Sequence, residues 1–132
     1  MLSKQYDLWS EIRETDFGAF EGMTKRELEG SDLSGAYSEW MLSKSTCYDV
    51  PHGESWNDIQ SRVELTFSRL ASLSESVILV SHGYFIRCLV GASLGLPPEV
   101  AARSIQTENY CVYRMCLDQD DRVKLASPLF FG

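Results

Sequence analysis

The sequence has 132 residues, of which 44% are hydrophobic and 23% are charged, and 19 acidic against 12 basic residues give a net charge of −7. These totals are typical of one globular domain, so we expect residues 1–132 to form a single domain rather than a disordered segment. The acidic balance, without any cluster of lysine and arginine, argues against a nucleic-acid partner.

Motifs for metals, redox chemistry and membranes are missing. Cys47, Cys88, Cys111 and Cys116 form no C-x-x-C pair and have no histidine at zinc-ligand spacing, so no metal site and no cofactor is implied. No apolar run approaches membrane-spanning length, and no basic start precedes an apolar stretch. We therefore expect a cytoplasmic protein with reduced thiols and no contact with a membrane.

The first third of the chain is predicted as loop and short helices. Residues 1–13 show no clear periodicity, and residues 14–23 are typical of an extended, glycine-punctuated loop. Thr24, with Glu27 three residues later, predicts a capping box that opens a short helix ending near Gly30.

Two further helices are predicted before residue 74. Apolar positions on one face indicate a helix from residue 32 or 34 to about 42. Residues 47–55 are a turn-rich connector, and Ser55 with Asp58 resembles a helix N-cap. Apolar residues then step by three and four over 56–73, which predicts the clearest amphipathic helix in the chain.

The remaining elements alternate between strand and helix. The run Val77-Ile-Leu-Val80 predicts a strand over 77–81 that is buried on both faces. Helices are predicted over 84–95 and over 98–104. Alternation predicts a strand over 109–117, and after a turn at Asp120-Asp121 a weaker strand over 123–126.

His82 follows the predicted strand and precedes the predicted helix. In open α/β sheets ligands bind outside the carboxyl ends of the strands, where helix N-termini offer free N–H groups to an anion. On position alone, His82 is equally compatible with a structural role, either capping the helix or hydrogen-bonding a carbonyl.

Three segments, taken in order, resemble a known family. They are EIRETDFGAFEGMT at 11–24, VPHGESWNDIQSRV at 50–63 and VILVSHGYFIRCLVGASLGLP at 77–97. Together they resemble the histidine phosphatase superfamily, the phosphoglycerate-mutase-like enzymes that include alpha-ribazole phosphatases, over about residues 9–109. The resemblance implies an α/β fold, a three-layer α/β/α sandwich of the phosphoglycerate mutase type, incomplete because its first strands are missing.

The resemblance also implies site residues and a substrate class. His82 matches the second active-site histidine, which with Gly83 would bind the phosphoryl oxygens, and Glu14 matches the acid/base carboxylate. The ligand would be a small phosphorylated molecule or inorganic phosphate. On composition alone, Glu14 is one solvated acid among several.

The neighbouring polar and aromatic residues keep two interpretations each. Arg87 could support the site or be a solvated or ion-paired arginine, and Ser81 could hydrogen-bond nearby or cap the helix. His52 is interpreted as a loop histidine. Trp40, Tyr48 and Trp56 could form a cap over the pocket, although aromatic residues at this spacing are more often core.

The nucleophile of the family is missing from the sequence. The family requires an R-H-G motif on its first strand and a second arginine, whereas the only histidines here are His52 and His82. We therefore expect an N-terminally truncated protein that is inactive alone. The open edge at 77–80 would be covered in a homo-oligomer or by a complementing N-terminal fragment.

Three origins remain open for such a chain. It could be a phosphatase-like domain that is a fragment, a truncated gene product or half of a split phosphatase. It could also be a non-catalytic module that binds phosphate and serves binding, regulation or assembly, or a decayed remnant without a selected role.

Overall fold

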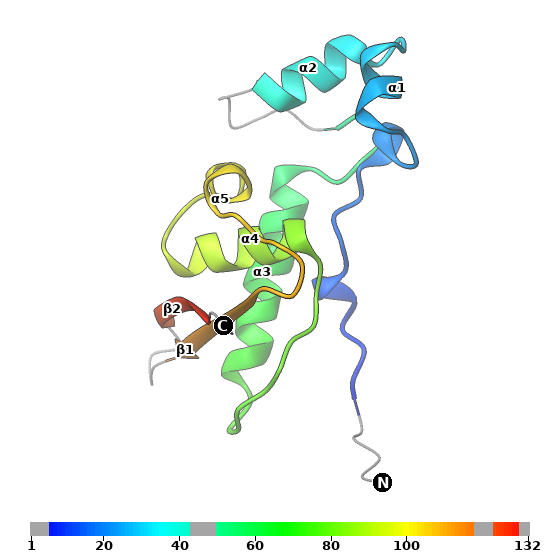
Figure 1. Cartoon of the computed structure of the whole chain (residues 1–132). Helices are drawn as coiled ribbons and strands as arrows, with labels where there is room; N and C mark the ends of the chain where they lie inside the picture. Colours follow the sequence, from blue (N-terminus) through cyan, green and yellow to red (C-terminus); the bar gives the residue numbers. More distant parts are fainter. Residues whose placement is uncertain (1–5, 43–49, 118–122, 130–132) are drawn as a thin grey trace, which may run out of the picture.

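The computed structural model describes residues 6–42, 50–117 and 123–129 (Figure 1). The elements in chain order are the 3-10 helices η1 (Ser10–Ile12) and η2 (Gly18–Phe20), the α-helices α1 (Lys25–Glu29), α2 (Ser34–Leu42), α3 (Trp56–Ala71), α4 (Gly83–Ser93) and α5 (Pro98–Ser104), and the strands β1 (Val112–Leu117) and β2 (Val123–Leu129). Within these described residues no helix is both long and apolar enough to cross a bilayer.

Local capping starts α1 and α3 where the sequence predicts. The Thr24 hydroxyl accepts from the Glu27 amide, and the Glu27 carboxylate accepts from the Thr24 amide at 2.7 Å. Ser55 and Asp58 form the same reciprocal pair at the start of α3. Both predicted caps are confirmed, and each satisfies amides that a helix N-terminus leaves without an intrahelical partner.

The main core lies between α3, α4 and α5. Its buried members are Trp56, Ile59, Val63, Phe85, Cys88, Leu89 and Ala102. Gly91 permits the close approach of α4 to α5, because a Cβ at this position would lie only 2.0 Å from the Ala101 Cβ. The predicted helices 56–73, 84–95 and 98–104 are confirmed within two residues at each end.

A second core belongs to the lobe formed by α1 and α2, which lies at one end of the molecule, at the top of Figure 1. Its buried residues are Phe20, Leu28, Tyr37 and Val50. The helix predicted to end at residue 42 is confirmed as α2. One polar link from this lobe to the body is the Arg103 guanidinium, which donates to the Trp40 carbonyl at 2.8 Å.

The described residues contain one sheet, a two-stranded antiparallel pair in which Val112 pairs with Leu129 and Met115 with Ala126. Both strands lie where alternation predicts them, although β1 starts three residues later and β2 ends three residues later than expected. The predicted turn at Asp120-Asp121 lies outside the described residues. Helices and strands of an α/β protein are therefore present, while the three-layer sandwich with its missing first strands stays a prediction.

The strand predicted over 77–81 is wrong as a strand. This segment has neither helix nor strand structure, and Ile78 and Val80 are 88% and 83% exposed while Leu79 packs on the main core. A strand requires a hydrogen-bonded neighbour, and no described segment pairs with this one. The apolar run is real, but the burial on both faces that it predicts is absent.

Candidate functional site

Glu14 lies at the beginning of α4, although 71 residues separate it from Phe85. One carboxylate oxygen accepts from the Thr15 amide at 3.0 Å and, in a longer contact, from the Phe85 amide at 3.4 Å. The carboxylate therefore meets an unsatisfied N–H group and the positive end of the helix dipole.

His82 is the N-cap residue of the same helix, but its side chain makes no capping bond and is exposed. The capping interpretation of His82 is therefore wrong, because the Glu14 carboxylate takes an N-terminal amide of α4 instead. The structure brings Glu14 to the first turn of the helix that His82 begins, and leaves the imidazole facing solvent.

Polar contacts hold the Glu14 segment beside this turn. The Ser81 hydroxyl donates to the Ile12 carbonyl at 2.6 Å, so it bonds across the site instead of capping α4. On the other side, Arg62 donates to the carbonyls of Glu11 and Arg13 at 2.8 and 2.9 Å. Residues 11–13 are thus fixed from two directions, which determines where Glu14 lies.

Arg62 is itself fixed by a buried ion pair with Glu54. The two side chains form a bidentate contact, with one bond of 2.6 Å, and are only 10% and 5% exposed. Arg62 also lies 4.5 Å above the Phe85 ring. Buried, bidentate arginine–carboxylate contacts have strict geometry. The pair therefore fixes the position of Arg62, and through it the segment 11–13 that precedes Glu14.

A second polar chain supports Gly83. The Thr107 hydroxyl donates to the Gly83 carbonyl at 3.2 Å and accepts from Arg87 at 2.9 Å. Arg87 also donates to the Ala102 carbonyl at 3.4 Å. Arg87 is partly buried and has no ion pair within the described part of the chain, and its hydrogen bonds make it a support of the turn that carries His82 and Gly83.

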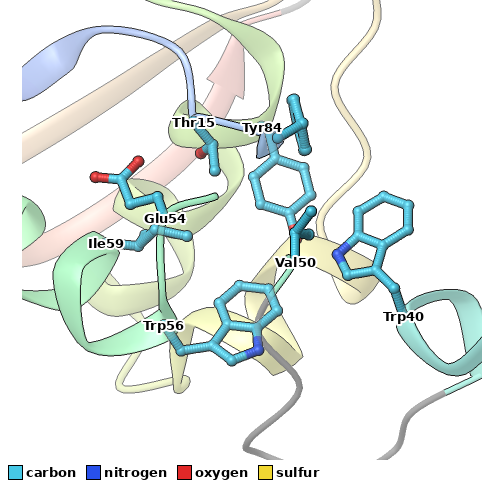
Figure 2. A pocket seen from close by; sticks show the side chains of 8 residues that line it. Thr15, Trp40, Val50, Glu54, Trp56, Ile59 and Tyr84 are labelled. Carbon is cyan, nitrogen blue, oxygen red and sulfur yellow. The ribbon is translucent and has the colours of Figure 1, made fainter. Parts of the chain in front are cut away.

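A small cavity lies beside Thr15 and Tyr84, the residues that follow Glu14 and Gly83 in the chain (Figure 2). It is lined by Thr15, Phe17, Trp40, Val50, Glu54, Trp56, Ile59 and Tyr84. Both indole rings, those of Trp40 and Trp56, pack against the Tyr84 ring with centroid distances of 6.4 and 6.1 Å. Trp40 and Trp56 line this cavity, and they also belong to the packed interior: Trp56 is a buried member of the main core and Trp40 packs against the second core. The core interpretation therefore holds for Trp56, the cap interpretation stays a prediction, and Tyr48 lies outside the described residues.

Burial removes two nearby groups from acid/base or nucleophilic roles at neutral pH. Desolvation raises the pKa of the Cys88 thiol to about 12 and raises the pKa of the Tyr84 hydroxyl above its ordinary value. Neither side chain supplies an anionic nucleophile, so the candidate chemistry stays with Glu14 and His82. No group of residues that could hold a metal ion occurs in the described part of the chain.

His52 lies in the turn at Pro51–Gly53 and is exposed, as expected of a loop histidine, and its φ is 61°. This turn packs against Gly18, where a Cβ would lie 2.3 Å from the Gly53 nitrogen. Gly18 also has a φ of 46°, so both space and backbone conformation require glycine there.

Sequence interpretation missed Arg62, Glu54 and Thr107. A signal existed for Arg62: it lies on the apolar face of α3 between Ile59 and Val63, where a charged residue needs a buried partner. Nothing in the sequence distinguishes Thr107, because its contacts lie 20 and 24 residues away along the chain.

The fold and site together define an α/β protein in which a carboxylate and a histidine lie at one helix N-terminus. The sequence profile of the histidine phosphatase superfamily (branch 1) matches residues 1–127. The chain therefore belongs to the histidine phosphatase superfamily.

Individual relatives agree with this assignment. The "Probable phosphoglycerate mutase GpmB" of Enterobacter sp. is 30% identical over 119 residues, which are 88% of this chain and 53% of the relative. The protein of the same name from Shigella boydii serotype 18 is 30% identical over 123 residues, 89% of this chain and 54% of the relative. The chain thus spans about half the length of the curated relatives it matches.

Solved structures show the same fold. The alpha-ribazole phosphatase from Shigella flexneri superposes with a TM-score of 0.74 at 23% identity, covering 89% of this chain and 57% of that one. The structure named mycobacterial hydrolase 1 gives a TM-score of 0.63 at 23% identity, covering 91% of this chain and 60% of that one. The expected phosphoglycerate-mutase-like fold relationship is confirmed at this level.

Proposed function

We propose that this chain carries the acid/base carboxylate and the second histidine of a phosphomonoester phosphatase, and that these 132 residues alone bind phosphate without hydrolysing its esters. The observation that carries the proposal is the Glu14 carboxylate at the first turn of the helix that His82 begins. The family membership supports the reaction class.

The chemistry follows from the two groups. The exposed His82 imidazole and the amide of Gly83 would donate to the equatorial oxygens of a phosphoryl group, where negative charge spreads in the transition state. Glu14 would protonate the leaving alcohol and then accept a proton from the attacking water. The chain has two histidines and no R-H-G motif, so the attacking imidazole must come from another segment.

The exposed run at 77–80 supports this need for a second segment. Val77, Ile78 and Val80 present apolar side chains to solvent next to the site. Unpaired extended segments of this composition are covered in proteins by strand addition. We propose that an R-H-G-bearing strand pairs here, which would complete both the sheet and the active site; a homo-oligomer would cover the same residues without restoring activity.

The alternative function is a phosphate-binding or assembly module without catalysis. It is favoured by the same observation that limits the first proposal, the missing nucleophile. The two differ in one respect: a split phosphatase gains turnover when an R-H-G segment is supplied, and a binding module does not.

Calorimetry with inorganic phosphate, paired with a hydrolysis assay on p-nitrophenyl phosphate, tests the proposal. We expect a dissociation constant of about 1 mM, equivalent to about −4 kcal/mol, and no hydrolysis above buffer. His82→Asn should weaken binding at least about ten-fold, whereas the control His52→Asn should not change it. Equal effects of both substitutions, or His82-dependent hydrolysis by the pure chain, would contradict the proposal.

A further inference from the structure

The connector between α5 and β1, residues 105–111, touches the turn that begins α4. The Thr107 hydroxyl donates to the Gly83 carbonyl at 3.2 Å, across 24 residues of sequence. A Cβ built on Gly83 would lie 3.2 Å from the same hydroxyl oxygen, so the connector passes close to the backbone of this turn. Figure 1 shows the connector passing the first turn of α4 on its way from α5 to β1.

The Thr107 hydroxyl has a fixed direction. It accepts from the Arg87 guanidinium at 2.9 Å, and Arg87 also donates to the Ala102 carbonyl at 3.4 Å. A guanidinium donates and never accepts, so the hydroxyl proton of Thr107 is left for the Gly83 carbonyl. One hydroxyl thus links the start of α4 with an arginine one turn further along the same helix.

Contacts on the β1 side hold the connector in place. The Tyr113 hydroxyl, at the beginning of β1, donates to the Gln106 carbonyl at 2.8 Å. Tyr110 has a φ of 65°, a left-handed conformation that residues other than glycine rarely adopt and that persists where the surrounding structure determines the backbone. The position of Thr107, the residue after Gln106, therefore depends on β1.

Gly83 needs such a restraint because it has no side chain of its own. Glycine has more backbone freedom than any other residue, and the side chain of the preceding His82 makes no capping bond. Ser81 anchors the chain before the turn, through its bond to the Ile12 carbonyl at 2.6 Å. Thr107 provides the anchor at Gly83 itself.

We propose that Thr107 is a positioning residue of the phosphate site: it holds Gly83 so that the Gly83 amide and the His82 imidazole face the same phosphoryl group. Backbone N–H groups bind an anion only when they point at it, because a hydrogen bond weakens steeply as its angle closes. Thr107 acts through Gly83 and does not touch the phosphate. The inference rests on the proposed function, in which His82 and Gly83 bind the phosphate.

Two substitutions of Thr107 test the role of its hydroxyl by calorimetry with inorganic phosphate. Thr107→Val keeps the shape of the side chain but removes the bonds to Gly83 and Arg87. We expect it to weaken phosphate binding about three- to ten-fold, the effect of one hydrogen bond. Thr107→Ser keeps the hydroxyl and should bind phosphate as the wild type does.

Two further variants separate positioning from stability. Tyr113→Phe loosens the connector without touching Thr107 and should weaken phosphate binding about two- to five-fold. Thr24→Val is the matched control, because it removes a threonine hydroxyl that bonds Glu27 in the cap of α1, away from this turn. It should lower stability and leave the phosphate affinity unchanged.

The Gly83 amide gives a readout that a loss of stability would not move. In proton–nitrogen correlation spectra at saturating phosphate, its proton should shift downfield in the wild type and in Thr107→Ser, as expected of an amide that donates to an anion. The shift should be smaller in Thr107→Val, because the amide no longer points at the phosphate. Urea unfolding checks that each variant is folded.

The outcomes separate this inference from the proposed function. Unchanged affinity in Thr107→Val or, should that variant not fold, in Tyr113→Phe would overturn the positioning role, while His82-dependent binding by the wild type would keep the proposed function. Equal weakening in Thr107→Ser, or in Thr24→Val, would also overturn the role of the hydroxyl. No binding of phosphate by the wild type would overturn the proposed function first, and the inference with it.

Discussion

Replacement of Arg62 by methionine removes the group that fixes the Glu14 segment, and its cost can be worked from the contacts. The Arg62 guanidinium makes two bonds to the Glu54 carboxylate and one each to the carbonyls of Glu11 and Arg13. After Arg62→Met, the 5% exposed Glu54 side chain keeps two weaker contacts among the described residues. They are Arg13, whose own side chain is 54% exposed, and the Asp16 amide at 3.4 Å.

Removal of one partner from a buried ion pair costs about 3–5 kcal/mol, because the other charge stays buried. Typical domains have a total stability of about 5–15 kcal/mol, so the loss is a large fraction of the total. We therefore predict that Arg62→Met lowers the free energy of unfolding by about 3–5 kcal/mol. Adding Glu54→Gln should recover about 1–3 kcal/mol of this loss by removing the stranded charge.

Urea unfolding followed by circular dichroism measures these differences at constant m-value. The control is Lys25→Met, which breaks an exposed ion pair with side chains 68% and 55% exposed and should cost less than about 0.5 kcal/mol. A loss below about 1 kcal/mol for Arg62→Met, or a double variant less stable than the single one, would refute the reasoning.

Three further predictions concern packing, pH and thiol chemistry. Gly91→Ala should lower the free energy of unfolding by about 1–3 kcal/mol, because its Cβ would meet α5 at 2.0 Å. Gly35→Ala, in the open part of α2, should raise the free energy of unfolding by about 0.5–1 kcal/mol in the same urea assay. Backbone bonding and Arg69 lower the pKa of the Glu11 carboxyl, so its contribution to stability is complete above the unfolded pKa and is lost as pH falls through the folded pKa. Thermal melts from pH 6 to about pH 3 should therefore show a shallower acid decline in Glu11→Gln than in the wild type, and identical declines would count against the pair. Cys88 is buried and its pKa is raised to about 12, so it should resist iodoacetamide at pH 8 while the partly exposed cysteines react. Peptide mass mapping measures the labelling of each cysteine, and early labelling of Cys88 would mean that the core opens.

Local chemistry explains the successful part of the sequence interpretation. The caps at Thr24 and Ser55 depend on residues three positions away, so the printed sequence contains everything they need. The buried face of α3 likewise follows from helical spacing, which one segment reveals by itself.

Non-local pairing explains the failure at 77–81 and the missed residues. A strand is stable only with a neighbour, and apolar character does not specify whether a neighbour exists. The contacts of Arg62 with Glu11 and of Phe85 with Glu14 span 51 and 71 residues, and only the folded chain shows them. Family resemblance supplied Glu14 as a candidate, whereas its place beside α4 required the structure.

The two histidines provide the most direct test of the central claim, that phosphate is held at the turn beginning α4. Proton NMR of the imidazole resonances during a titration with inorganic phosphate reports on His82 and His52 separately, since the sequence contains only these two. We predict a saturable shift of His82 with no change at His52, and a smaller shift of His82 in the Arg62→Met variant. Equal shifts of both histidines, or a shift confined to His52, would contradict the site described here.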